Sequence, residues 1–325
     1  MVQVILPAFF VAERPQNGLV ACADIRYAEH AVIIDVSRVG FYDPFGLAMV
    51  AASIQIALEN GCHVMACGQS DTATYLARMD VFNGVQWLGA CPEIGERHDR
   101  RRSLVEVTRI DDARDVDNAA DQLASAVVGQ IPDIDRTVVD DGMTAHSDFD
   151  RHVEPLKYCL TEVLENALTH ARRGGRDSAV WIACQYYRSQ DRISLAVIDN
   201  GCGFRTSLRN HPDLSEDATD RDAIMLGIRP RISCNRDLLV GADSVNQGVG
   251  LTTALRIVES ASGAGVVLSG NGLYSTAHRS AALGLGQCWD GVAIGMSWLR
   301  RCLPAIRYRD MLPPRNGERL SLRFE

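Results

Sequence analysis

A carboxylate and an amide four residues apart form the pattern in this chain that is most informative about chemistry. Glu162 and Asn166 lie in the stretch LKYCLTEVLENALTHARRGG, residues 156–175, which has the apolar spacing of a helix. Residues four apart share one helix face, so both side chains should point the same way. The positions around them on that face are apolar: Leu160, Val163, Leu164, Ala167 and Leu168. A carboxylate and an amide at this spacing can hold a water molecule and a metal ion side by side.

A first glycine motif follows a predicted strand. Residues Ile193–Ile198 have the pattern of a strand, and Asp199 ends it ahead of Gly201 and Gly203. A buried carboxylate at a strand end can accept the amino hydrogens of adenine, which phosphate or pyrimidine binding would not require. The two glycines allow the backbone to pass close to a base. Alone, the motif would also suit a tight turn, but its place in series with the other motifs favours binding.

A second glycine motif precedes a predicted helix. It reads Gly248-Val249-Gly250-Leu251, and the helix should run over Leu251–Ser260. The free backbone amides at a helix start favour phosphate. A single Gly-x-Gly is a weak signal, but the helix expected after it strengthens the interpretation as a phosphate site.

In this order the three motifs resemble the ATP-binding domain shared by histidine kinases, anti-sigma serine kinases, type II topoisomerases, heat-shock protein 90 and mismatch-repair ATPases, the GHKL or Bergerat fold. The resemblance implies a two-layer α/β sandwich over residues 151–325 that binds ATP with Mg²⁺. It implies Asn166 as the metal ligand and Glu162 as the catalytic residue that orients or deprotonates the attacking group. The implied cofactor-binding residues are Asn166, Asp199, Gly201, Gly203, Gly248, Gly250 and Leu251.

Two features leave the assignment of individual roles open. Glu162 could instead be a structural carboxylate, and histidine kinases keep a similar residue while transferring phosphate elsewhere. The family often has Gly-Thr where this chain has Gly291-Val292, and Val292 offers no hydroxyl toward the adenine.

The stretch between the glycine motifs, residues 204–247, is long for a passive loop. In the family it forms a lid over the phosphates. It contains six arginines, of which one or two should reach the γ-phosphate: Arg205, Arg209, Arg221, Arg229, Arg231 and Arg236. The sequence does not indicate which.

Residues 1–95 form a separate pattern. A buried strand is predicted over Ala31–Val36, and Asp43 and Pro44 suit the start of an apolar helix that ends at Asn60. This pattern resembles a STAS domain, the fold of anti-sigma-factor antagonists. That family has a phosphate-accepting serine at the turn where this chain has Pro44 and Phe45. We therefore expect a constitutive docking surface rather than a phosphate switch, with Phe45 as an apolar contact if its side chain is exposed.

A connector, residues 96–150, is expected between the two domains. It should contain one strand, Leu104–Ile110, one helix, Ala113–Val128, and an acidic linker, Asp133–Asp150. The predicted fold class is therefore α/β (α+β), a STAS-like sheet with helices followed by a histidine-kinase-like sandwich.

Composition narrows the classes of function. The net charge of −8 argues against general attraction to nucleic acid or to an anionic membrane. The ten cysteines include no Cys-x-x-Cys pair, which favours reduced thiols in a cytoplasm. The sequence shows no signal-peptide pattern and no apolar run of membrane-spanning length. We therefore expect a cytoplasmic protein.

Two functions remain open at this point. One is a Mg-ATP-binding regulatory protein whose nucleotide state controls the docking of a partner, with slow hydrolysis. The other is a serine or histidine kinase acting on a separate STAS-type or regulatory protein. A mechanical ATPase would need a later lysine that reaches the γ-phosphate, and Lys157, the single lysine, precedes the site. ATP and a protein partner are the expected partners, and a homodimer is also open.

Overall fold

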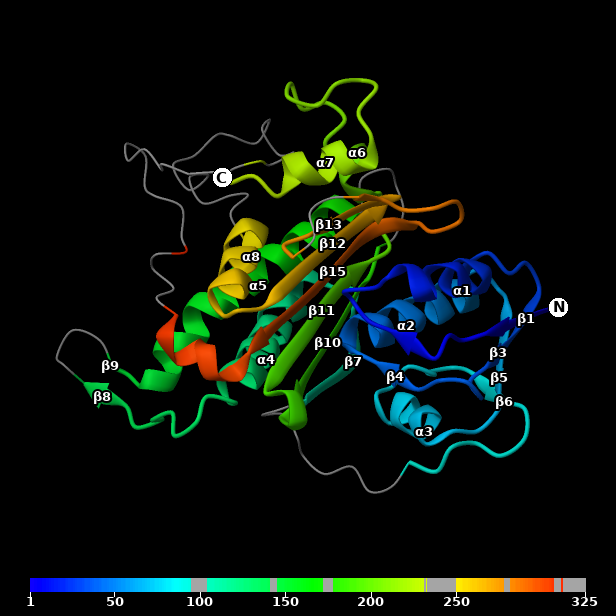
Figure 1. Ribbon diagram of the computed structural model, residues 1–325, viewed down its shortest axis with the longest axis horizontal. Coiled ribbons are helices and arrows are strands. Elements are labelled where there is room, and N and C mark those ends of the chain that lie inside the picture. Colours follow the sequence, from blue (N-terminus) through cyan, green and yellow to red (C-terminus); the bar gives the residue numbers. More distant parts are fainter. Residues whose placement is uncertain are drawn as a thin grey trace.

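The architecture is mixed α/β, with two principal sheets (Figure 1). The structure is a computed structural model of the 325-residue chain. It describes residues 1–94, 104–140, 145–171, 178–230, 232, 250–277, 281–306 and 311.

Residues 1–94, called the N-terminal unit from here on, are built on a four-stranded parallel sheet of order β1-β3-β5-β6. Its strands are β1 (Val2–Ile5), β3 (Ala31–Asp35), β5 (His63–Cys67) and β6 (Gln86–Trp87). Its helices are α1 (Gln16–Arg26), α2 (Pro44–Glu59) and α3 (Asp71–Arg78). A small parallel pair joins β2 (Phe9–Phe10) to β4 (Phe41–Tyr42).

Helix α2 begins and ends where the sequence predicts. Asp43 caps its start by accepting a hydrogen bond from the Gly46 amide at 3.0 Å, and Pro44 is the first helical residue. Asn60 ends the helix, and Gly61 follows with φ of 80°. All side chains from residue 44 to residue 54 are buried, so no face of this half of the helix meets solvent. Such a helix needs partners on two sides.

The second sheet supplies the other partner. It has seven antiparallel strands in the order β14-β13-β12-β15-β11-β10-β7. Their bounds are β7 (Leu104–Ile110), β10 (Val180–Tyr187), β11 (Arg192–Asp199), β12 (Ala264–Gly270), β13 (Gly272–Ser275), β14 (Ala281–Ala282) and β15 (Trp289–Leu299). The strand and helix expected in the connector, β7 and α4 (Val116–Val128), thus belong to this sheet and its helical layer.

Helices cover the two faces of the seven-stranded sheet differently. One face carries α4, α5 (Asp148–Ala171) and α8 (Gly250–Ser260), while the N-terminal unit lies on the other (Figure 1). The short helices α6 (Gly203–Ser207) and α7 (Asp220–Gly227) lie together at one end of the sheet, and the small hairpin of β8 (Val139–Asp140) and β9 (Ala145–His146) lies away from it.

Strand β11 shows how the two cores form. Ile193, Leu195 and Val197 belong to the core shared with α4, α5 and α8, whereas Ala196 and Ile198 belong to the core shared with α2. Side chains alternate between the two faces of a strand. The central strands therefore bury both faces, which is why β11 is apolar from Ile193 to Ile198 at every position except Ser194.

Helix α2 approaches the sheet closely because the sheet carries small residues there. A Cβ atom at Gly295 would lie 2.5 Å from Cβ of Ala12 and 3.0 Å from the Phe45 ring. Phe45 is 1% exposed and meets the Phe10 ring edge-on at 6.1 Å. The expectation that Phe45 offers an apolar contact to a separate partner is therefore wrong. It docks within the chain, against the seven-stranded sheet, because the start of α2 lies between the two units.

Candidate functional site

The polar pair on α5 has no polar partner among the residues that the structure describes. Glu162 and Asn166 are half-buried on the helix. Neither side chain makes a hydrogen bond or an ion pair with any residue in the described part of the chain. Partial burial, with a smaller effect of the nearby Glu165 carboxylate, raises the pKa of Glu162 above its ordinary value. A half-buried acceptor and amide without partners are groups that a ligand could engage.

The start of α8 lies directly against Glu162. Gly250 is the first residue of the helix, and a Cβ atom there would lie 2.4 Å from Cβ of Glu162 and 3.2 Å from the Cys159 carbonyl. A glycine is therefore required for the two helices to approach. The contact brings the free amides of the first turn of α8 beside Glu162. Leu251 is partly buried against the helical core, so its side chain serves packing, and Gly248 lies outside the described residues.

Asp199 is a buried carboxyl at the end of β11, as the sequence predicts. It is 4% exposed, and its Oδ1 accepts hydrogen bonds from the Gly201 amide at 2.8 Å and the Val292 amide at 3.2 Å. No described residue donates a hydrogen bond to Oδ2. Burial raises the pKa of Asp199 to about 7, although the two amide hydrogen bonds oppose this rise. One carboxyl oxygen thus remains available as an acceptor.

Steric crowding explains why glycines occupy the positions beside Asp199. Gly203 has φ of 70°, and a Cβ atom there would lie 2.7 Å from both the Asp290 carbonyl and Oγ of Ser269. A Cβ atom at Gly291 would lie 2.1 Å from the Asp199 carbonyl. Gly201 is buried and gives its amide to the Asp199 carboxyl. The backbones of two segments, at Gly201 and at Gly291–Val292, therefore meet at this carboxyl.

Short contacts connect the Asp199 turn with the end of α5. The Ala179 amide donates to Oδ1 of Asn200 at 2.8 Å, and the Ser178 hydroxyl lies 3.5 Å from the Leu168 carbonyl, two residues beyond Asn166. Helix α5 also packs on β11 and α6. The α5 pair, the start of α8 and the Asp199 carboxyl therefore lie at the same end of the seven-stranded sheet.

The first part of the expected lid is built as two short helices. Thr219 and Asp222 form a reciprocal capping box at the start of α7, and Oδ2 of Asp220 accepts from the Asn271 amide at 3.0 Å. These contacts fix α7 to the β12–β13 hairpin. Residues 231 and 233–249, which include Arg231 and Arg236, lie outside the described residues.

The described arginines of this stretch differ in position. Arg205, Arg209, Arg221 and Arg229 are all exposed. Only Arg229 is next to a direct contact with α8: the Thr252 hydroxyl in the first turn donates to the Ile228 carbonyl at 2.8 Å. Arg229 therefore follows a residue anchored at the start of α8. The sequence could not distinguish it from the other five, because the anchor joins residues 24 apart.

Lys157 has another role. Its ammonium group lies 2.9 Å from Oδ2 of Asp117 and 3.7 Å from Oδ1 of Asp121, so it ties α5 to α4. Among the residues that the structure describes, no three His, Cys, Asp or Glu side chains gather as a metal cluster. A metal ion held at Asn166 would therefore take its other ligands from a bound molecule and from water.

Two contributors were missed in the sequence analysis. The Trp289 indole N–H donates to the Asp199 carbonyl at 2.6 Å, and the Ser269 hydroxyl accepts from the Phe204 amide at 3.0 Å. The one available signal for Trp289 was an aromatic residue before Asp-Gly at the start of a strand. Its partner lies 90 residues earlier, so spacing alone could not reveal the contact.

Comparison of the chain with protein-family models, with curated proteins and with solved structures found no match. No helix within the described ranges is both long enough and apolar enough to cross a membrane.

Proposed function

We propose that this protein binds ATP with Mg²⁺ between α5, the Asp199 turn and the start of α8, as a GHKL-type nucleotide site. The observation that carries the proposal is the set of polar groups at one end of the sheet that no described residue engages. These are the side chains of Glu162 and Asn166, Oδ2 of Asp199, and the amides at the start of α8 beside Gly250.

Asp199 selects adenine in this proposal. Its Oδ1 is engaged by the Gly201 and Val292 amides, and its Oδ2 accepts a hydrogen from the exocyclic amino group of the base. Guanine carries a carbonyl at the corresponding ring position, so it would bring two acceptors together. Gly201 and Gly203 let the base approach the backbone.

The phosphates lie toward α8 and α5. The free amides at the start of α8 bind phosphate oxygens, and Arg229 adds a guanidinium from the neighbouring segment. Asn166 holds Mg²⁺ through its amide oxygen, and the ion neutralises phosphate charge when bound. Glu162 accepts the proton of the attacking water. Because partial burial raises its pKa, it is a stronger base than an exposed carboxylate.

The N-terminal unit makes this a regulatory module in our proposal. The order of its strands and helices supports a STAS-like assignment, but the position that accepts phosphate in that family is filled by Pro44 and Phe45 and is buried against the second sheet. Nucleotide state, rather than phosphorylation of this unit, then controls a protein partner. Transfer of phosphate to a separate regulatory protein is the second candidate, since Glu162 could equally accept the proton of a hydroxyl.

Calorimetric titration with Mg-ATP tests the proposal. Asn166→Ala should abolish metal-dependent binding, whereas the matched control Asn118→Ala, on the exposed face of α4, should bind like the wild type. Equal affinity in wild type and Asn166→Ala would refute the assignment. Measuring free phosphate release against transfer of label to added partner proteins then separates the two functions.

A further inference from the structure

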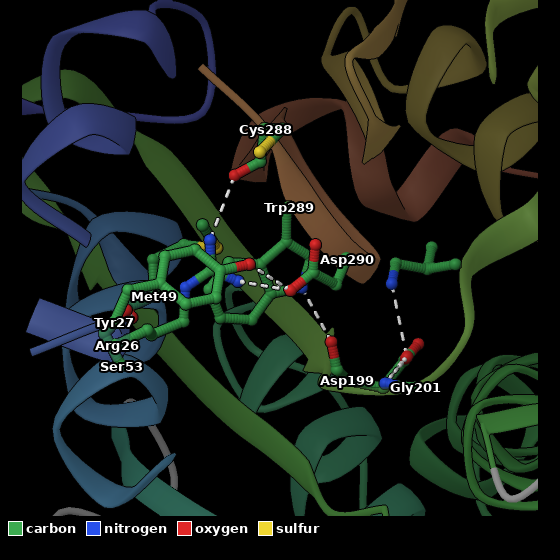
Figure 2. Close-up of polar contacts among 10 residues, drawn as sticks. Arg26, Tyr27, Met49, Ser53, Asp199, Gly201, Cys288, Trp289 and Asp290 are labelled. Carbon is green, nitrogen blue, oxygen red and sulfur yellow. Dashed lines mark hydrogen bonds and ion pairs between the residues drawn. The ribbon is translucent and has the colours of Figure 1, made fainter. Parts of the chain in front are cut away.

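A buried arginine of the N-terminal unit contacts one short segment of the second unit, residues 288–290. Arg26, the last residue of α1, is 4% exposed. Its guanidinium donates to the Cys288 carbonyl at 3.1 Å, lies 3.7 Å from Oδ2 of Asp290 and stacks 4.1 Å from the centre of the Trp289 ring (Figure 2). Within the described part of the chain, all polar partners of this guanidinium lie in residues 288–290.

The next residue, Tyr27, binds the same segment. The Tyr27 hydroxyl donates to Oδ2 of Asp290 at 2.6 Å, and its ring lies 5.3 Å from the Arg26 guanidinium carbon (Figure 2). Asp290 is thus contacted by two successive residues: Arg26, the last residue of α1, and Tyr27, which follows it. A buried arginine is costly unless it is paired, so this contact is specific rather than incidental.

The same segment also adjoins the Asp199 corner, by which we mean Asp199 with Gly201, Gly203, Gly291 and Val292. The Trp289 indole donates to the Asp199 carbonyl, as Figure 2 shows, and the Asp290 carbonyl limits the space at Gly203. Gly291 then passes against Asp199, and the Val292 amide donates to its carboxyl. Three consecutive residues, 288–290, therefore contact the N-terminal unit on one side, and the residues from 289 onward shape the candidate adenine corner on the other.

We propose that Arg26 and Tyr27 are positioning residues for the adenine corner, acting through Trp289 and Asp290, so that the N-terminal unit sets the nucleotide affinity and specificity of the second sheet. This inference rests on the proposed function. Coupling between sites is reciprocal, so a ligand or partner that displaces the end of α1 weakens ATP binding, and bound ATP strengthens the hold on α1. The N-terminal unit is then a part of the nucleotide site and not only a docking module.

Two conservative variants, called the relay variants, test the contacts that connect α1 with the Asp199 corner. Neither of them removes the buried charge of Arg26. Trp289→Phe removes the donor to the Asp199 carbonyl, and Tyr27→Phe removes the hydroxyl that binds Asp290. The loss of one hydrogen bond corresponds to about a 3- to 10-fold increase in the Kd for Mg-ATP. Matched controls lie at the far end of the same sheet. Tyr186→Phe removes a hydroxyl 3.3 Å from the Asp191 carboxyl, and Trp298→Phe removes an indole N–H that has no hydrogen-bond partner among the described residues.

Nucleotide specificity separates positioning from a merely structural role. Both relay variants should lose part of the preference for ATP over GTP, because the Asp199 corner is displaced. The controls should keep that preference even if their melting temperatures fall. Relay variants that bind ATP and GTP with the wild-type ratio would overturn the inference while leaving ATP binding intact. A wild-type chain that binds no Mg-ATP would instead overturn the proposed function, and the inference with it.

Discussion

Replacing Asp199 with asparagine should make the folded chain more stable at neutral pH and at the same time prevent ATP binding. The asparagine Oδ1 can still accept from the Gly201 and Val292 amides, which bind Oδ1 of the native carboxyl at 2.8 and 3.2 Å. Its amino group would replace Oδ2, to which no described residue donates. The substitution therefore removes a buried charge without breaking a hydrogen bond, but it presents a donor to the amino group of adenine.

The size of the stability change follows from the pKa. Burial raises the pKa of Asp199 to about 7 in the folded chain, and the value in an unfolded chain is about 3.9. Because the folded value is the higher one, the contribution of Asp199 to the free energy of unfolding is fully present below about pH 4 and is lost as the pH rises through about 7. About three units at about 1.4 kcal/mol each give a loss of about 4 kcal/mol. Asparagine does not titrate, so the variant avoids this loss.

Denaturant unfolding of both proteins at several pH values measures this effect. The free energy of unfolding of Asp199→Asn should exceed that of the wild type at pH 8, and the difference should shrink steadily toward pH 4. Asp217→Asn, at an exposed position, is the matched control for the chemical change from aspartate to asparagine. If the pH dependence of Asp199→Asn matched that of the wild type, the carboxyl could not be the buried titrating group described here.

Three further predictions concern the phosphate side and the N-terminal unit. Arg229→Gln should weaken Mg-ATP about 10-fold, a typical value for one charge-assisted hydrogen bond, and should weaken AMP little. Arg209→Gln, its exposed control, should bind both nucleotides normally in calorimetry, and equal losses in the two variants would remove the special role of Arg229. Gly250→Ala should push α8 away from Glu162, where the new Cβ would lie 2.4 Å from a side-chain carbon, and should lower Mg-ATP affinity while AMP affinity changes less. After incubation with γ-labelled ATP, peptide mapping should find no stable phosphate between Ser37 and Ser53. Ser53, for example, is buried and donates to the Met49 carbonyl at 2.7 Å, so it should not be accessible to phosphate transfer. Stable label in this range would instead support a self-acting kinase.

Local signals predicted the elements of the fold well where residues typical of helix ends mark the boundaries. Asp43, Pro44 and Asn60 marked both ends of α2, and the structure confirms them. Helix α1 was missed because Pro15 and Asn17-Gly18 look like a turn. Gly18 lies inside the helix for a tertiary reason: a Cβ atom there would lie 2.3 Å from the Phe10 ring. A packing contact thus overrides a local preference that argues against a helix.

The relation between the two sheets could not be read from local pattern. The only hints were a helix that is apolar on every side and a set of small residues at alternating positions of distant strands: Ala183, Ala196, Ala293 and Gly295. Neither identifies its counterpart. For the same reason, the sequence identified Asp199 as a strand-end carboxylate but not the Trp289 indole that holds its backbone. Spacing rules locate groups within one element, whereas these contacts join elements about 90 residues apart or more.

Titration of the wild-type chain with Mg-ATP and with Mg-GTP in a calorimeter tests the central claim most directly. The claim is that the polar groups at one end of the seven-stranded sheet that no described residue engages form an adenine nucleotide site. The account predicts saturable, magnesium-dependent binding of ATP that equimolar GTP does not displace. Absence of ATP binding would contradict the proposed function, and equal competition by GTP would contradict the role given to Asp199.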